Sequence, residues 1–231
     1  MSDHRTIIIT GASSGIGRAT ARLLTANGWN AVLAARSVDR LDALAAELGD
    51  HRSLAVGCDV TDWDSVSAMT AEAIERFGTV DAVFANAGFG GPGGFTGSTP
   101  DAWREMVLTN VYGAALTVRA TIDHLRESNG HMLLTGSVAG RRAIPGSLYS
   151  CTKWAVTAMG EAVRGEVAGS GVRVTLIEHG IVATPFWDDG KGPLENPLTE
   201  DDVAGAVRWA LEQPPHVDVN EILMRPAAQA V

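Results

Sequence analysis

The stretch Ile7-Ile8-Ile9-Thr10-Gly11-Ala12-Ser13-Ser14-Gly15-Ile16-Gly17 decides the fold of this 231-residue chain. Its first three residues form a short β-branched run, as expected of a strand buried on both faces. Glycines follow at the spacing Gly-x3-Gly-x-Gly, and a helical pattern begins after them. A glycine turn between strand and helix lets the backbone approach a pyrophosphate at the helix N-terminus. The stretch therefore predicts nucleotide binding, with a tight turn that holds no ligand as the alternative.

Beyond this stretch, short apolar runs alternate with segments of helical periodicity. The runs interpreted as strands are 31–35, 54–56, 80–85, 132–134, 172–177 and 221–224. The predicted helices are one with Ile16, Ala19 and Leu23 on its inner face, then 41–48, 62–77, 111–125, 149–168 and 200–211. Continuously apolar strands alternating with helices predict a parallel sheet covered on both faces, in one domain spanning 1–231. The stretches 89–98 and 185–197 are expected to be long loops.

Composition narrows the classes of function. The chain has 18 basic and 27 acidic residues and a net charge of −9, so nucleic acid is not an expected partner. Its apolar runs are too short to span a membrane, and its N-terminus has no signal-peptide stretch. Cys58 and Cys151 lie too far apart for metal-ligand spacing or a disulfide framework. These features predict a soluble cytoplasmic protein with no metal.

The residues that directly follow the predicted strands are not those that core packing requires. After the glycine turn they are Arg36, Asp59, Val60, Asn86, Ala87, Gly88, Ser137, His179 and Gly180. In an open parallel sheet, ligands bind outside the carboxyl ends of the strands. We therefore expect a single site along one edge of the sheet.

Arg36 points to the kind of nucleotide. It stands at the end of the second predicted strand, where NAD enzymes carry an acidic residue for the ribose 2′-hydroxyl. A guanidinium suits a 2′-phosphate instead, so the sequence favours NADP(H). The alternative is a solvated arginine that pairs with Asp39.

Tyr149 and Lys153 are four residues apart in a predicted helix and share one of its faces. A phenol has a pKa of about 10, and a nearby ammonium favours the phenolate and lowers that pKa. A tyrosine in this setting is a usable acid or base near neutral pH. A purely structural Tyr-x3-Lys pair is the alternative.

Together these motifs resemble the short-chain dehydrogenase/reductase family over nearly the whole chain. The resemblance rests on Thr10, Gly11, Gly15, Ile16, Gly17, Asp59, Asn86, Ala87, Gly88, Asn110, Ser137 and the run Tyr149 to Lys153, in that order. It implies a Rossmann-type three-layer α/β/α sandwich around a seven-stranded parallel sheet. It also implies a homotetramer or homodimer built on the helices that begin near Thr109 and Tyr149.

The resemblance also implies roles for residues. Tyr149 would protonate a substrate carbonyl or deprotonate an alcohol, and Lys153 would lower the pKa of Tyr149. Ser137 would orient the carbonyl, and Asn110 would hold a water in a proton relay. NADP(H) would be held by Gly11, Ser13, Ser14, Gly15, Ile16, Gly17, Arg36, Asp59, Val60, Asn86, Ala87, Gly88, Tyr149, Lys153, Gly180, Ile181 and Thr184. The implied activity is hydride transfer between nicotinamide and a small-molecule ketone, 3-oxo acid or 3-hydroxy acid. A catalytically silent NADP-binding sensor or scaffold and an epimerase-type enzyme are the alternatives.

The C-terminal stretch 216–226 resembles an NADP-dependent subgroup that includes 3-hydroxy acid (serine-type) dehydrogenases and the clavulanate-pathway dehydrogenase. Two features depart from the family. His179 stands where the family usually has proline, and it would either reach the nicotinamide or substrate or fill the turn. The segment 185–197, which begins near Phe186 and Trp187, is short for a substrate lid. Cys151, between Tyr149 and Lys153, is interpreted as a small packed residue.

Overall fold

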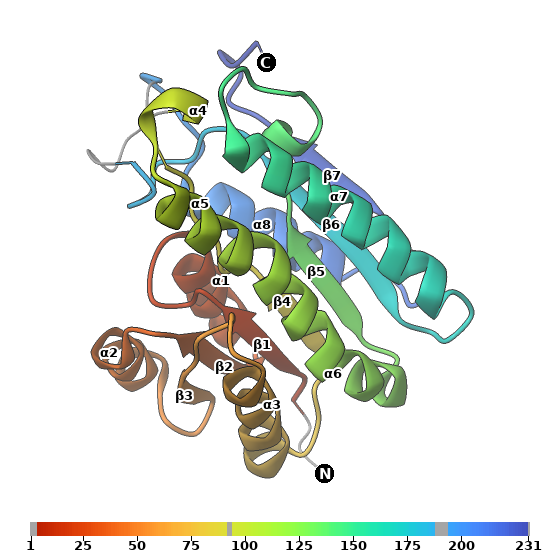
Figure 1. Ribbon diagram of the computed structural model, residues 1–231. Coiled ribbons are helices and arrows are strands. Elements are labelled where there is room, and N and C mark those ends of the chain that lie inside the picture. Colours follow the sequence, from red (N-terminus) through yellow and green to blue (C-terminus); the bar gives the residue numbers. More distant parts are fainter. Residues whose placement is uncertain (1–3, 92–93, 188–193, 231) are drawn as a thin grey trace.

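In the part of the chain that the structure describes, the sheet holds seven strands in the order β3-β2-β1-β4-β5-β6-β7, and every neighbouring pair is parallel. The computed structural model describes residues 4–91, 94–187 and 194–230 (Figure 1). The strands are β1 (Thr6–Thr10), β2 (Asn30–Ala35), β3 (Ser53–Gly57), β4 (Ala82–Ala85), β5 (His131–Thr135), β6 (Arg173–His179) and β7 (Glu221–Met224). This is the parallel sheet that the sequence predicts, and each predicted strand is found within a few residues of its expected bounds.

The strand order reverses between β1 and β4, which lie side by side with Ile8 opposite Val83. From β1 the chain builds outward to β2 and β3, then returns to place β4 on the other side of β1. Such a switch point leaves a crevice at the carboxyl ends of the two strands, because their connections leave in opposite directions. The glycine turn follows β1, and Asn86 follows β4, so both border this crevice.

Helices cover both faces of the sheet, which gives the expected three layers (Figure 1). They are α1 (Gly15–Ala26), α2 (Val38–Leu48), α3 (Trp63–Phe77), α4 (Gly94–Gly97), α5 (Pro100–Val107), α6 (Ala114–Ser128), α7 (Leu148–Val167) and α8 (Glu200–Leu211). Two short segments complete them, a π-helical turn η1 (Leu108–Gly113) and a 3-10 turn η2 (Val138–Gly140). The fold is a Rossmann-like α/β/α sandwich.

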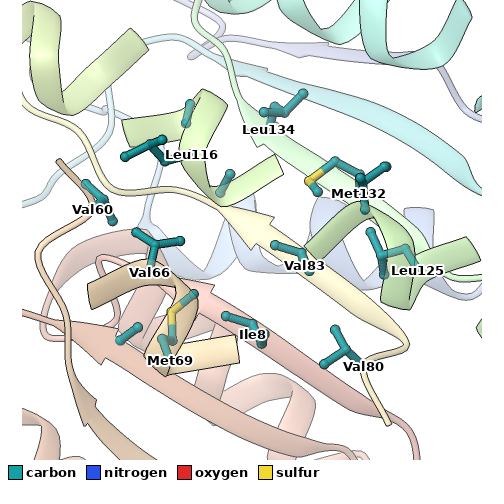
Figure 2. Packing of buried hydrophobic residues seen from close by; sticks show 14 of the residues in the cluster. Ile8, Val60, Val66, Met69, Val80, Val83, Leu116, Leu125, Met132 and Leu134 are labelled. Carbon is teal, nitrogen blue, oxygen red and sulfur yellow. The ribbon is translucent and has the colours of Figure 1, made fainter. Parts of the chain in front are cut away.

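The core has two halves because successive side chains of a strand point to opposite faces. Ile8, Val83 and Met132 pack with residues of α3, α6 and α7, as Figure 2 shows for Met69 and Leu125. Ile7 and Ile9 face the other way, into the cluster with α1, α2 and α8. Strands β1 and β4 are therefore buried on both faces, and this fixes the positions of the turns that follow them.

Two local predictions need correction. The helix expected from about residue 109 begins at Pro100 and runs through α5, η1 and α6 to Ser128. Its start has a clear signal, because the side chain of Thr99 caps the helix and Pro100 takes its first position. In α1, Ile16 and Ala19 are buried as predicted, whereas Leu23 is only partly buried and Leu24 is fully buried.

The predicted loop 89–98 contains α4, and its residues 92–93 lie outside the described part of the chain, as do 188–193 of the predicted loop 185–197. Within the described ranges, no helix combines the length and the apolar character needed to cross a membrane.

Candidate active site

Each glycine of the turn between β1 and α1 is favoured by a positive φ angle, by a close approach of backbone, or by both. Gly11 and Gly15 have φ angles of +69° and +58°, which favour glycine. A Cβ on Gly11 would lie 3.0 Å from Cα of Ala87, and one on Gly17 would lie 2.5 Å from the carbonyl oxygen of Gly11. The turn is thus folded against the segment after β4.

The N-terminus of α1 fits the diphosphate of a dinucleotide. Ser14 is the N-cap, yet its side chain makes no cap hydrogen bond, and the first turn contains no acidic residue. The first N–H groups of a helix lack partners within the helix, and the helix dipole makes this end positive. Gly15, Ile16 and Gly17 therefore present backbone donors suited to an anion, next to the partly exposed Ser13 and Ser14.

Thr10, at the end of β1, ties the glycine turn to the segment after β4. Its hydroxyl accepts hydrogen bonds from the N–H groups of Asn86 and Ala87, at 3.0 and 3.1 Å. Asn86 Nδ2 donates to the carbonyl oxygen of Thr10 at 3.1 Å, and Asn86 Oδ1 accepts from Thr135 Oγ1 at 3.1 Å. These bonds lock together the carboxyl ends of β1, β4 and β5.

Lys153, in α7, extends its side chain to the carboxyl end of β5. Its side chain is only 4% exposed, and Nζ donates to the carbonyl oxygen of Thr135 at 2.7 Å. Gly88 leaves room beside it, since a Cβ there would lie 3.8 Å from Lys153 Nζ and 3.1 Å from Asn110 Oδ1. The structure thus brings Gly88, Asn110 and Lys153 together, as the sequence predicts.

Asn110, in η1, holds the backbone after Gly88. Its Oδ1 accepts from the N–H of Phe89 at 3.0 Å, and its Nδ2 donates to the carbonyl oxygen of Phe89 at 2.9 Å and to Thr152 Oγ1 at 3.1 Å. The side chain therefore shapes the loop after β4. Its expected part in a proton relay stays a prediction.

Tyr149 and Ser137 meet at the carboxyl end of β5. Ser137 caps η2, and its Oγ accepts from the N–H of Ala139 at 3.1 Å and donates to the carbonyl oxygen of His179 at 3.3 Å. Ser137 also interacts with the phenol of the half-buried Tyr149, and this interaction favours a lower pKa of that phenol. Lys153 Nζ lies 5.6 Å from the centre of the Tyr149 ring. The three side chains form one cluster.

The expected lowering of the Tyr149 pKa is not found. Burial raises the pKa of Tyr149 to about 12, and the interaction with Ser137 only partly opposes this. Burial also lowers the pKa of Lys153 to about 8, and its Nζ is directed to the carbonyl of Thr135. Loss of solvent disfavours the charged form of both groups, and here it outweighs their mutual attraction.

The segment after β6 lines the site from the other side. His179 Nδ1 lies 2.8 Å from the carbonyl oxygen of Gly180, and burial lowers the pKa of its imidazole to about 4. Thr184 is close to the glycine turn, because a Cβ on Gly15 would lie 3.7 Å from its Cγ2. The N–H of Ile181 donates to Gln229 Oε1 at 2.9 Å, so this donor is already used within the chain.

The adenosine end of the predicted cofactor site lies at β2 and β3. Arg36 is exposed, and its charge helps to lower the pKa of Asp59, although the hydrogen bond from the N–H of Thr61 contributes more. Val60 is buried against Gly113 of η1. The positive charge of Arg36 therefore lies outside the core, directly after the carboxyl end of β2.

The roles of three positions were not predicted from the sequence. Thr10, which was named only as part of the motif, connects strand ends together with Thr135, and Phe186 packs on Tyr149. Both threonines end strands beside residues that were singled out, which is a usable signal. Phe186 carried no signal for its contact with Tyr149, because the two are far apart in the sequence.

Comparisons with known proteins find relatives that match nearly the whole chain. A family model described as short chain dehydrogenase matches residues 5–191. An uncharacterized oxidoreductase of Staphylococcus saprophyticus is 35% identical over 241 residues, covering 98% of each chain. The solved alcohol dehydrogenase of the archaeon Thermococcus sibiricus, complexed with 5-hydroxy-NADP, is 35% identical with a TM-score of 0.91 and 98% of each chain covered.

Two further solved structures extend the comparison. A serine dehydrogenase complexed with NADP+ is 30% identical, with a TM-score of 0.91 over 98% of this chain and 96% of the other. A 3-ketoacyl-(acyl-carrier-protein) reductase of Brucella melitensis, complexed with NADH, is 27% identical, with a TM-score of 0.87 over 94% and 96% of the two chains.

Proposed function

The chain belongs to the short-chain dehydrogenase family of oxidoreductases, and from that premise we propose that it is an NADP(H)-dependent enzyme that interconverts a carbonyl and a secondary alcohol. The observation that carries the proposal is the cluster of Tyr149, Ser137 and Lys153 beside the glycine turn. A packed core needs none of these polar groups at the end of β5.

The protonation states favour reduction at neutral pH. Because the pKa of Tyr149 is about 12, its phenol carries a proton that it can donate to a carbonyl oxygen. Ser137, whose side chain interacts with that phenol, would hold the same oxygen. Lys153, with a pKa of about 8, is mostly charged at neutral pH and would stabilise the phenolate that remains. When bound, the nicotinamide supplies the hydride, so the chain's residues manage the proton and the position of the substrate.

NADP(H) is favoured over NAD(H) by the place of Arg36. Its exposed guanidinium follows β2, and Asp59 across from it has its carboxylate engaged by Thr61. A guanidinium fork matches phosphate geometry. Two of the similar solved structures contain an NADP species, whereas one contains NADH.

Short hydroxy and oxo acids are the substrate class that we propose. This rests on the resemblance of residues 216–226 to serine-type dehydrogenases and on the similarity to the solved serine dehydrogenase. In this structure part of the stretch forms β7, which pairs with β6 and so supports the segment that follows His179.

A substrate panel tests the proposal. The purified protein is given NADPH with ketones and 3-oxo acids, or NADP+ with 3-hydroxy acids, and cofactor oxidation state and products are followed. We expect turnover of at least one carbonyl–alcohol pair. Tight NADPH binding without any turnover would contradict the proposal and indicate a sensor. A changed substrate without net cofactor oxidation would indicate an epimerase-type enzyme.

A further inference from the structure

Phe186 lies against the proposed proton donor. Its ring centre is 5.5 Å from that of Tyr149, and the rings meet edge to face at 61°. Phe186 follows β6, whereas Tyr149 begins α7, so the contact joins two separate walls of the site. The ring nevertheless remains 44% exposed. It therefore borders the space in front of the Tyr149 phenol.

The position of the ring depends on a glycine in the loop after β4. A Cβ on Gly90 would overlap Cζ of Phe186 and would lie 3.0 Å from its Cε2. A side chain at residue 90 and the observed ring position therefore exclude each other. The neighbouring Gly91 has no such conflict, because a Cβ there would make an ordinary 3.4 Å contact with Met106. The two glycines thus form a matched pair for substitution.

Phe186 is held by a hydrogen bond of its backbone N–H and by a ring contact with its neighbour Trp187. Its N–H donates to Thr184 Oγ1 at 3.3 Å. The ring of Trp187 packs on it at 5.2 Å, and Trp187 Nε1 donates to the carbonyl oxygen of Val182 at 3.0 Å. A ring held in this way resists displacement by a substrate, because moving it would break several contacts at once.

We propose that Phe186 is a specificity-determining residue whose ring, seated on Gly90 and against Tyr149, occupies the space that a bulky substituent of the carbonyl would need. The inference rests on the proposed function and deepens it. The preferred substrates are carbonyl compounds that carry a small group, such as methyl or methylene, on the side of Phe186. Short oxo acids meet this requirement, and aryl ketones with bulk on both sides do not.

The extent to which Phe186 shields the Tyr149 phenol from solvent can be measured from the pKa of Tyr149, without an activity assay. The chain has two tyrosines, so in a Tyr112→Phe background the phenol titration reports Tyr149 alone. Phe186→Ala and Gly90→Ala should each lower the pKa of Tyr149 by about one unit or more, since burial is what raises it. Gly91→Ala should leave it unchanged. An unchanged titration in Phe186→Ala would overturn the inference.

Selectivity is measured as kcat/KM for an aryl ketone divided by kcat/KM for the corresponding methyl-bearing ketone. Phe186→Ala should raise this ratio about tenfold or more, since one extra methylene in a tight pocket already changes discrimination by that much. Gly90→Ala should raise it in the same direction, and the double variant should add little, because both changes remove the same obstruction. Gly91→Ala is the control.

The outcomes separate the two claims. No turnover by the wild-type protein on any carbonyl would overturn the proposed function and the inference with it. Turnover with an unchanged or lowered ratio in Phe186→Ala would overturn the role of Phe186 alone. A lowered ratio would mean that the ring attracts bulky groups instead of excluding them.

Discussion

Arg36 is the side chain on which the preference for NADP(H) depends. It is exposed after the carboxyl end of β2 and lies near Asp59. Nothing in the core requires a cation there, so its substitution should affect the ligand and not the fold. Substitution of Arg36 therefore distinguishes two interpretations, namely that Arg36 contacts the cofactor or that it is a solvated arginine at the start of a helix.

We predict that Arg36→Asp weakens NADPH binding about tenfold or more and shifts preference toward NADH, since a lost charge-assisted contact is worth about 1.4 kcal/mol or more. Fluorescence titration with both nucleotides measures this. Arg40→Asp changes the charge equally on the same exposed helix start and should have a much smaller effect. Equal NADPH affinity in wild type and Arg36→Asp would remove Arg36 from the site.

At the scale of elements, one buried carboxylate joins β6, the segment after η2 and α7. Glu178 is fully buried, and its two oxygens accept from Arg141 Nε at 2.7 Å each. Thr157 of α7 donates to Oε1 at 3.1 Å, and Arg141 also pairs with Glu221 of β7. Burial raises the pKa of Glu178, and Arg141 opposes this. The network fixes the segments that carry Ser137 and Tyr149.

Glu178→Gln should therefore lower the free energy of unfolding by about 2 kcal/mol or more, because it leaves Arg141 without its buried partner. Urea denaturation at neutral pH measures the loss. Glu221→Gln removes the more exposed partner of Arg141 and should cost about 1 kcal/mol or less. A loss in Glu221→Gln as large as that in Glu178→Gln would contradict this account.

Much of the fold and of the candidate site could be predicted from the sequence. The features that could not be predicted depend on tertiary contacts and burial. Apolar runs and helical periodicity located the sheet, and the glycine turn, Ser137, Tyr149 and Lys153 converge as expected. The bond from Thr10 to the segment after β4 and the contact of Phe186 with Tyr149 join distant residues, so no local pattern shows them. The raised pKa of Tyr149 depends on burial, which a spacing rule does not contain. The expected dimer or tetramer stays a prediction.

For the molecule as a whole, the net charge of −9 sets a condition on cofactor binding. An acidic protein that binds a polyanion must do so through local groups and not through its overall field. Arg36 and the N–H groups at the start of α1 supply such a local field along one edge of the sheet.

A buried histidine at the amino-terminal end of β5, away from the proposed site, limits stability in acid. His131 begins β5 and is 1% exposed. Thr175 Oγ1 donates to the carbonyl oxygen of Val219, so it accepts from His131 Nε2 at 2.7 Å. Among the described residues, His131 Nδ1 has no hydrogen-bond partner. Burial, with a contribution from Arg173, lowers the pKa of His131 to about 3.

The unfolded chain therefore takes up a proton at His131 below about pH 6.5 while the folded protein does not. His131 by itself should lower the free energy of unfolding by about 1.4 kcal/mol for each pH unit below that value, until its folded pKa is reached. His179, whose folded pKa is about 4, should add to this fall. His131→Asn should flatten this slope between about pH 6 and pH 4 in urea denaturation series. The exposed His51→Asn should retain it, and an unaltered slope in His131→Asn would refute the assignment.

The central claim is that Tyr149 is the proton donor of a carbonyl reductase, and the two tyrosines of the chain allow a matched test. Turnover of NADPH with the best carbonyl substrate is measured for Tyr149→Phe and for Tyr112→Phe, whose ring is exposed on η1. We predict that Tyr149→Phe loses roughly 100-fold or more in kcat while still binding NADPH, and that Tyr112→Phe keeps wild-type turnover. Wild-type turnover by Tyr149→Phe would contradict the claim.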